Sequence, residues 1–239
     1  MKVSIAINLS ISSFLQGMND IQGATKMELK QELVAFRADY ERTAPAERIA
    51  LYNAKVEELR ASFQMDGVLA AGQRAPDFEL PSASGRAVSL AEVLQKGPAV
   101  LVFYRGGWCP YCNIQLRAYQ QVLPEILQLG ANLIAISPQL PDGSLSTAER
   151  NALDFAVLSD AGNGVAQSFG LVYSLPEELR QALRSVDKAL PDINGDESWA
   201  LPVPATFVIA SDGRIALSHV DIDYRGRCEP EVVLSVLRS

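Results

Sequence analysis

The chain has two regions that differ in how apolar and polar residues alternate. From Met27 onward, apolar residues recur every three or four positions, which is the spacing of an amphipathic helix. The first predicted helix carries on one face Leu29, Leu33, Phe36 and Tyr40. A second helix follows with the apolar positions Ile49, Tyr52, Val56, Leu59 and Phe63.

Local signals mark the two ends of this second helix. Thr43 is a suitable N-cap, Pro45 fits the first turn, and Asp66-Gly67 is expected to stop the helix. Residues 27–66 would then form a helical hairpin, which cannot bury both of its apolar faces alone. We expect the hairpin to pack on the rest of the chain. A homodimer, in which it packs on a second copy, is the alternative that the sequence leaves open.

Beyond a small, Gly- and Pro-containing linker over residues 67–77 (GVLAAGQRAPD), the pattern changes to alternating strands and helices over residues 73–239. Strands are predicted at residues 99–104, 132–137, 155–158, 206–210 and 215–220. Helices are predicted at residues 110–129, 145–152, 163–169, 176–189 and 230–238.

The order of these elements predicts the fold class. Residues 99–104 (AVLVFY) and 132–137 (NLIAIS) are continuous apolar runs separated by one long helix, which is typical of buried parallel strands in a βαβ unit. Asp212-Gly213 is a hairpin turn signal, so the last two strands should be antiparallel. We therefore predict an α/β fold with a mixed central sheet flanked by helices on both faces.

Residues 1–26 do not fit either region. Lys2 and the apolar run after it resemble a signal peptide only weakly, since no small-x-small cleavage site follows and Asn8 and several serines interrupt the run. Met18 and Met27 offer alternative starts. We interpret residues 1–26 as a poorly ordered leader, with export as the less favoured alternative.

Composition and charge exclude several classes of protein. The 239 residues are 48% hydrophobic and 21% charged, with no apolar stretch long enough to span a membrane. A formal net charge of -7 argues against nucleic acid and anionic membrane surfaces as partners. Three cysteines are too few for a secreted disulfide framework, so we expect a reducing compartment, the cytoplasm. The single histidine, His219, is interpreted as a structural residue.

The candidate chemistry lies where the first buried strand meets the long helix, in the segment FYRGGWCPYC. Pro110 suits the first position of a helix, which places Cys109 at the N-cap and Cys112 one turn later. Unpaired N–H groups and the positive end of the helix dipole stabilise a thiolate at such a position. Cys112 is close enough to attack an oxidised Cys109. Two core cysteines or half of a zinc site are the disfavoured alternatives, because zinc needs further ligands that the spacing does not supply. We predict no metal and no other cofactor.

With these residues in view, WCPYC after a buried strand resembles the active site of a thioredoxin fold, and CPYC matches the glutaredoxin motif. The wider frame, APDFELPSASGRAVSLAEVL and SLSTAERNALDFAVLSDAGNGVAQSFGL, is similar to peroxiredoxins of the alkyl hydroperoxide reductase and thiol-specific antioxidant family, in a branch with a CxxC motif. The resemblance implies a thioredoxin-like fold. It also implies a cysteine that attacks the peroxide O–O bond, a second thiol that resolves the sulfenic acid, and thioredoxin, glutaredoxin or glutathione as the reductant.

Two arguments conflict on which sulfur attacks. The resemblance aligns this segment with the usual family pattern Pro-x-x-x-Thr-x-x-Cys. In that alignment Arg105 replaces the proline, Cys109 replaces the threonine, and Cys112 takes the position of the attacking cysteine. The thioredoxin-like position and the helix dipole instead favour Cys109, which we expect to be the more exposed thiol with the lower pKa. We give the electrostatic argument more weight and predict that Cys109 attacks.

Several further residues are candidates for supporting roles. The family usually carries an arginine where VPATFVIASDG has Pro204, which is the neighbourhood of the thioredoxin cis-proline. We expect a cis Val203-Pro204 bond that presents the Val203 backbone to an extended partner. A cation that stabilises the thiolate could be Arg105 or Arg227, the latter in a segment GRCEPE that resembles the family's Gly-Arg segment. Trp108 and Tyr111 are expected at the rim of the site, and Cys228 is expected to be a bystander.

The residues and the resemblance together predict a thiol peroxidase that reduces hydrogen peroxide or small organic hydroperoxides through the Cys109/Cys112 pair. Two alternatives remain open. One is a general thiol-disulfide oxidoreductase acting on protein disulfides, and the other is a redox sensor.

Overall fold

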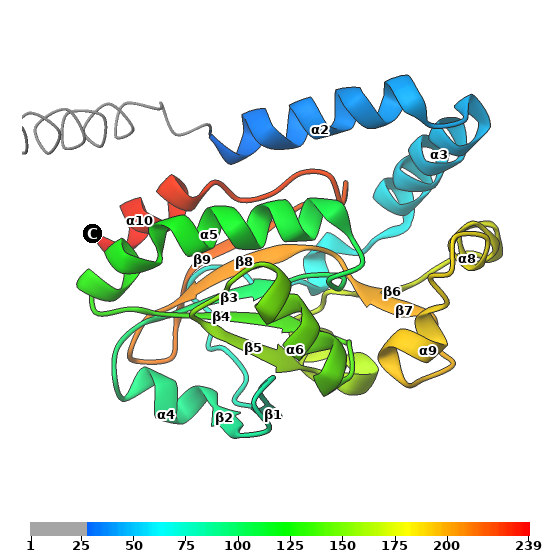
Figure 1. The fold of residues 1–239 in the computed structure, drawn as a ribbon. Helices are drawn as coiled ribbons and strands as arrows, with labels where there is room; N and C mark the ends of the chain where they lie inside the picture. Colours follow the sequence, from blue (N-terminus) through cyan, green and yellow to red (C-terminus); the bar gives the residue numbers. More distant parts are fainter. Residues whose placement is uncertain (1–27) are drawn as a thin grey trace, which may run out of the picture.

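The computed structural model describes residues 28–239, so the expected leader at residues 1–26 lies outside the described residues (Figure 1). A five-stranded sheet in the order β5-β4-β3-β8-β9 forms the centre of this part of the chain. Its strands are β3 (Ala99–Phe103), β4 (Asn132–Ser137), β5 (Ala156–Ser159), β8 (Ala205–Ile209) and β9 (Ile215–Val220).

The strand directions match the sequence prediction. β3 pairs in parallel with β4, and β4 pairs in parallel with β5, whereas β8 is antiparallel to both β3 and β9. The turn between β8 and β9 contains Gly213 at φ 84°, a left-handed conformation that glycine adopts without strain. Every residue of β3 is fully buried, which explains why its sequence is apolar without alternation. The predicted mixed α/β fold is confirmed.

Helices cover both faces of the central sheet (Figure 1). One apolar core joins the sheet to α5 (Pro110–Gln128) and α10 (Pro230–Leu237), and a second core on the opposite face joins it to α4 (Leu90–Leu94) and α7 (Gly164–Ser168). The remaining helices of this region are α6 (Pro141–Arg150), α8 (Glu177–Arg184) and α9 (Leu190–Asn194), with a 3-10 turn η3 (Ala161–Asn163).

Two small sheets stand apart from the central one. They pair β1 (Glu79–Pro81) with β2 (Ala87–Ser89) and β6 (Val172–Ser174) with β7 (Ala200–Pro202). Together with α4 and α9, these elements have no counterpart in the sequence prediction. Strands of three residues and helices of five residues are too short to produce a recognisable period.

The N-terminal helices are α2 (Leu29–Thr43) and α3 (Ala46–Ser62), followed by a 3-10 turn η2 (Met65–Gly67). α2 contacts α5, and α3 contacts α8, so each helix packs on the rest of the same chain (Figure 1). The prediction that Thr43 caps the second helix is wrong. Thr43 is the last residue of α2, and its hydroxyl donates to the carbonyls of Asp39 and Tyr40 in the preceding turn.

Among the described residues, no helix is long and apolar enough to cross a membrane.

Candidate active site

The loop between β3 and α5 carries the two cysteines. Pro110 is the first residue of α5 and Cys109 is its N-cap, with φ -93° and ψ 115°, as the spacing predicts. The carbonyl of Cys109 accepts hydrogen bonds from the N–H groups of Cys112 and Asn113, which are 3.1 and 3.2 Å away. The first turn of the helix therefore holds the two cysteines next to each other.

Polar contacts from neighbouring elements fix the loop before Cys109. The N–H of Gly107 donates to the side-chain oxygen of Gln139 at 2.5 Å, and the Asn113 amide donates to the Gly107 carbonyl at 2.9 Å. The Asn151 amide in turn donates to the Asn113 side-chain oxygen. These contacts tie the loop to α5 and to the α6 region, so the position of Cys109 depends on both of these parts of the fold.

Gly107 has no room for a side chain, and this predicts a loss of stability in Gly107→Ala. A Cβ at this position would stand 2.1 Å from the Thr147 hydroxyl oxygen and 3.1 Å from the Thr147 Cβ. Overpacking of this kind costs about 1–3 kcal/mol, so we expect a lower midpoint in urea unfolding. Adding Thr147→Ala should restore part of the loss. Gly67→Ala is the control, because a Cβ at Gly67 meets nothing within 4 Å. Equal midpoints for wild type and Gly107→Ala would contradict the prediction.

Both sulfurs are buried, and they differ in environment. Cys109 is 1% exposed and Cys112 is 0% exposed, so exposure to solvent hardly distinguishes the two thiols. The N-cap lies beneath the rim residues of the loop rather than at the surface. The two thiols are instead distinguished by access, because Cys109 lines a cavity and Cys112 does not.

The charges around the two thiols favour a thiolate on Cys109. A hydrogen bond from the Cys112 thiol lowers the pKa of Cys109 well below its usual value. Burial opposes this effect, and the guanidinium groups of Arg105 and Arg227 add to the lowering. Burial raises the pKa of Cys112 well above its usual value, as does its hydrogen bond to Cys109. The direction of each shift fits a pair in which Cys109 carries the negative charge and Cys112 retains its proton.

Arg105 is a buried cation whose main neighbours are aromatic rings. It follows β3, is 6% exposed, and its guanidinium carbon lies 4.9 Å from the ring centroid of Trp108 and 4.3 Å from that of Tyr224. Within residues 28–239, no carboxylate forms an ion pair with it. The thiolate of Cys109 is therefore the anion best placed to compensate this buried charge.

Arg227 lies on the other side of the pair. Its Nη2 donates to the Cys112 sulfur at 3.3 Å, while its Nη1 donates to the carbonyls of Tyr224 and Gly226. It too has no carboxylate partner in the described part of the chain. The sequence offered Arg105 or Arg227 as the cation of the site, and the structure places both beside the cysteines.

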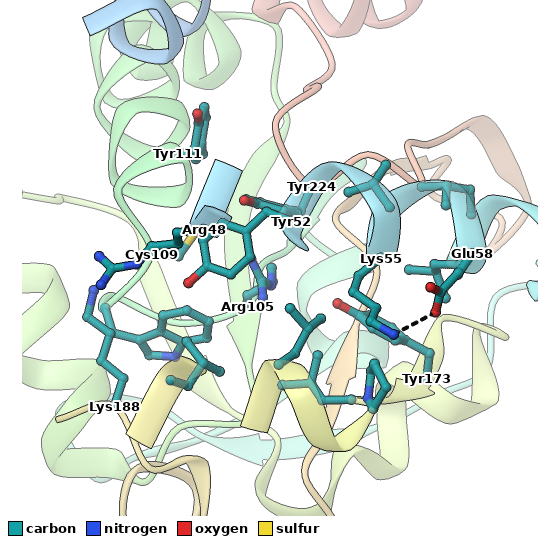
Figure 2. A pocket seen from close by; sticks show the side chains of 18 of the residues that line it. Arg48, Tyr52, Lys55, Glu58, Arg105, Cys109, Tyr111, Tyr173, Lys188 and Tyr224 are labelled. Carbon is teal, nitrogen blue, oxygen red and sulfur yellow. Dashed lines mark hydrogen bonds and ion pairs between the residues drawn. The ribbon is translucent and has the colours of Figure 1, made fainter. Parts of the chain in front are cut away.

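Aromatic side chains form the rim (Figure 2). Trp108 and Tyr111 both line the cavity, as expected. The Tyr111 ring makes edge-to-face contacts with the rings of Phe36 in α2 and of Tyr224, with 5.0 and 5.6 Å between ring centroids. The N-terminal helix α2 therefore reaches the active site. Tyr224 and Tyr173 were missed by the sequence analysis. They come from a loop and from β6, and no motif connects them to the CxxC segment.

The expected cis Val203-Pro204 bond is wrong, because the described residues contain no cis peptide bond. The chain runs through this bond from β7 directly into β8, and the Val203 N–H donates to the Leu171 carbonyl at 2.9 Å. The Val203 side chain is fully buried in the core on the face of the sheet opposite the cysteines. Its N–H is therefore already satisfied within the chain, and we assign Val203 and Pro204 no part in binding a partner.

Cys228 and His219 lie apart from the cavity. Burial raises the pKa of the Cys228 thiol to about 11, which makes it a poor nucleophile at neutral pH. Its sulfur donates to the Glu229 carbonyl at 3.6 Å, and neither Cys228 nor His219 lines the cavity. No group of three or more His, Cys, Asp or Glu residues within 28–239 is arranged to hold a metal ion.

The cavity beside Cys109, which we call the Cys109 pocket, has a volume of about 360 Å³. It lies between the start of α5, the helices α3 and α8, and the segment around Tyr224 (Figure 2). Because Cys109 forms part of its wall, a substrate that enters the pocket meets this sulfur before it can meet Cys112.

Comparisons with known proteins give a consistent assignment. Residues 71–218 match the model of the AhpC/TSA family. The peroxiredoxin Bcp of Escherichia coli K12 is 28% identical over 171 residues, which cover 71% of this chain and 96% of that protein. A putative peroxiredoxin of Mycobacterium tuberculosis is 28% identical over 159 residues, covering 66% of this chain and 89% of that protein.

Solved structures agree with these relatives. The crystal structure of the peroxidoxin BcpB from Mycobacterium tuberculosis matches with a TM-score of 0.57 and 25% identity, covering 71% of this chain and 97% of that one. A peroxiredoxin 6 from Arenicola marina matches with a TM-score of 0.55 at 20% identity, covering 72% and 73% of the two chains, which supports the thioredoxin-like fold. The chain belongs to the AhpC/TSA family and is a peroxiredoxin, a thiol-dependent peroxidase of thioredoxin-like fold.

Proposed function

We propose that this chain reduces hydroperoxides through a dithiol cycle in which Cys109 attacks and Cys112 resolves. The observation that carries the proposal is the position of Cys109. Of the two cysteines, Cys109 is the one that lines the Cys109 pocket. The pKa of its thiol is lowered, and the buried guanidinium groups of Arg105 and Arg227 contribute to this lowering. These are the conditions under which a cysteine is a thiolate nucleophile at neutral pH.

In the first step, the Cys109 thiolate attacks the terminal oxygen of the hydroperoxide and the O–O bond breaks. The sulfur loses two electrons and becomes a sulfenic acid, and the leaving alkoxide or hydroxide takes up a proton to form an alcohol or water. The charge that develops on the leaving oxygen is stabilised by nearby cations, and Arg105 lines the same pocket as Cys109.

In the second step, the Cys112 sulfur attacks the sulfenic acid of Cys109, a disulfide forms, and water leaves with the Cys112 proton. The first turn of α5 supports this step, because it holds the two cysteines together through the hydrogen bond from the Cys112 N–H to the Cys109 carbonyl at 3.1 Å. Two thiols and one hydroperoxide thus give one disulfide, one alcohol or water, and one water. A dithiol or thiol reductant of the thioredoxin, glutaredoxin or glutathione class then returns both cysteines to the reduced state.

The substrates proposed from the sequence are hydrogen peroxide and small organic hydroperoxides, and the compartment is the cytoplasm, where such reductants keep thiols reduced. The proposal keeps a homodimer as the alternative that the sequence leaves open.

Stopped-flow oxidation of the reduced protein by hydrogen peroxide, run beside insulin-disulfide reduction, tests the proposal. We expect rapid oxidation, with one disulfide formed per peroxide consumed, and insulin reduction close to the uncatalysed rate, because the Val203 backbone is not free to receive an extended peptide. Cys228→Ser is the control and should behave as wild type. Insulin reduction without peroxide consumption would instead indicate a disulfide oxidoreductase, and slow oxidation without turnover would indicate a redox sensor.

A further inference from the structure

The Cys109 pocket is much larger than the smallest substrate proposed for it. Its volume of about 360 Å³ falls in the range of pockets that bind ligands of drug size, roughly 300–1,000 Å³. Hydrogen peroxide is only slightly larger than a water molecule, whose share of liquid volume is about 30 Å³. A cavity of this size beside the attacking sulfur has room for the body of a substrate as well as for its peroxide group.

Apolar side chains make up most of the wall. They come from α3, from α8 and the segments that flank it, and from the aromatic rim (Figure 2). The side chains of the wall that are contributed by α3, by α8 and by the segment before α8 include Tyr52, Val56, Leu59, Leu175, Leu179 and Leu183. An apolar wall of this extent favours a substrate with a hydrocarbon body.

The helices that form this wall include one outside the part of the chain that matches the family. The AhpC/TSA model matches residues 71–218, whereas α3 spans Ala46–Ser62. An ion pair between Lys55 of α3 and Glu178 of α8, with 2.7 Å between the charged atoms, links the two helices across the pocket. The side chain of Lys55 is only 12% exposed. The pocket is therefore built in part by N-terminal helices outside the region that matches the family model.

The pocket wall carries more positive than negative charge. Lys55 is paired with Glu58 and Glu178, so this group contributes no excess positive charge. Arg48 and Lys188 are half-buried, line the pocket, and form no ion pair within residues 28–239. Glu58 is the only acidic residue of the lining, and it is held by Lys55. The wall thus carries two uncompensated cations in addition to Arg105, which favours a substrate with an anionic end.

We propose that the Cys109 pocket makes this enzyme selective for amphiphilic hydroperoxides, with a long hydrocarbon body against α3 and α8 and an anionic end near Arg48 and Lys188. This inference rests on the proposed function. The peroxide group meets the Cys109 sulfur, and the reaction is the one given above, with the alcohol of the same chain as its product. Arg48, Leu59 and Leu179 are then specificity-determining residues for a reaction that the cysteines perform.

A series of carboxylate hydroperoxides of increasing chain length, compared with hydrogen peroxide, tests the selectivity of the wild-type enzyme. Burial of each added methylene is expected to raise kcat/KM by as much as about fourfold until the pocket is filled. The carboxylate should also be preferred over its methyl ester. Equal kcat/KM for all members and for hydrogen peroxide would overturn the inference and leave the proposed function intact. Failure to consume any peroxide, hydrogen peroxide included, would instead remove the proposed function.

Substitutions in α3 locate the selectivity. Arg48→Glu is expected to lower the ratio of kcat/KM for the long-chain carboxylate over hydrogen peroxide by about tenfold, the size expected for loss of a charge-assisted contact. Arg60→Glu makes the same charge change on the same helix at a residue outside the pocket lining, and should leave the ratio at the wild-type value. Equal ratios in the Arg48→Glu and Arg60→Glu proteins would overturn the assignment of the anionic end.

Binding can be measured without turnover. Calorimetric titration of the Cys109→Ser protein with the long-chain hydroxy carboxylate, which has no peroxide bond, should show binding that Ser62→Trp prevents by filling the pocket. Ser62 is an exposed pocket-lining residue at the end of α3. Binding of the hydroxy carboxylate by the Cys109→Ser protein, together with a wild-type protein that consumes no peroxide, would support the pocket and contradict the peroxidase cycle. Absence of binding in the Cys109→Ser protein would contradict the pocket.

Discussion

Cys109→Ser is expected to reduce the rate of oxidation by peroxide by about a thousandfold or more, because the attacking sulfur is removed. Cys112→Ser should still react once. In that protein the sulfenic acid of Cys109 has no resolving thiol, so it should accumulate and be trapped by dimedone, which mass spectrometry of the Cys109 peptide detects. Neither variant should turn over with a thiol reductant. Cys228→Ser should keep most of the wild-type activity, because this buried thiol lies apart from the pair.

The same pair of variants decides between the two registers. Family register assigns the attack to Cys112, and the contact of Arg227 with the Cys112 sulfur is the structural observation on that side. The opposing observations are that Cys112 does not line the pocket and that burial raises its pKa. Rapid formation of a sulfenic acid on Cys112 in the Cys109→Ser protein would reverse the assignment and make Cys109 the resolving thiol.

The parts of the fold that the sequence predicted are those with long, uniform patterns. β3 and β4 were found because full burial on both faces makes their sequences continuously apolar. α5 was found because its start is marked by Pro110 and its apolar positions recur over nineteen residues. The short sheet of β6 and β7 was missed, and this matters for the site, because β6 supplies Tyr173 to the pocket.

The candidate site was predicted where its chemistry is local in the sequence and missed where it is not. Cys109 and Cys112 share one helical turn, so their spacing alone indicated their role. Arg227 approaches the pair from more than a hundred residues away in the chain and was indicated only by the resemblance of its segment to the family. Tyr173 and Tyr224 carry no such signal and were missed. The cis bond at Pro204 was inferred from the resemblance of its surrounding sequence to that of the thioredoxin cis-proline, and no physical constraint in the sequence required it. In the structure the bond is trans, and the Val203 N–H donates to the Leu171 carbonyl.

The role of Arg105 leads to a prediction about pH. The thiolate of Cys109 is present above the pKa of that thiol and is lost as the pH falls through it. The hydrogen bond from Cys112 contributes most to lowering this pKa, and Arg105 is the cation that lowers it most. In Arg105→Met the pKa of Cys109 should therefore rise, and the acidic limb of the pH–rate profile should move to higher pH. On this acidic limb, below the pKa, we expect the rate of oxidation to fall about tenfold for each unit by which the pKa rises.

Arg225→Met is the matched control for this effect. Its guanidinium also lies over the Tyr224 ring, at 5.7 Å, but it is paired with Asp223 and is not among the groups that lower the pKa of Cys109. Its pH profile should match that of wild type. The ultraviolet absorbance of the thiolate, followed during acid titration of the reduced proteins, checks the pKa directly and is independent of turnover. An unshifted titration in a folded Arg105→Met protein would contradict the proposed role.

The stability of Arg105→Met separates function from folding. Replacing a buried charge by an apolar side chain of similar size is often neutral or stabilising, because the cost of removing the charge from water disappears. Arg105 has no carboxylate partner in the described chain, so its burial is compensated by Tyr173, by the rings of Trp108 and Tyr224, and by the thiolate. We therefore expect the urea midpoint of Arg105→Met to equal or exceed that of wild type while its reactivity on the acidic limb falls. A large loss of stability would show instead that Arg105 is retained to hold the fold together.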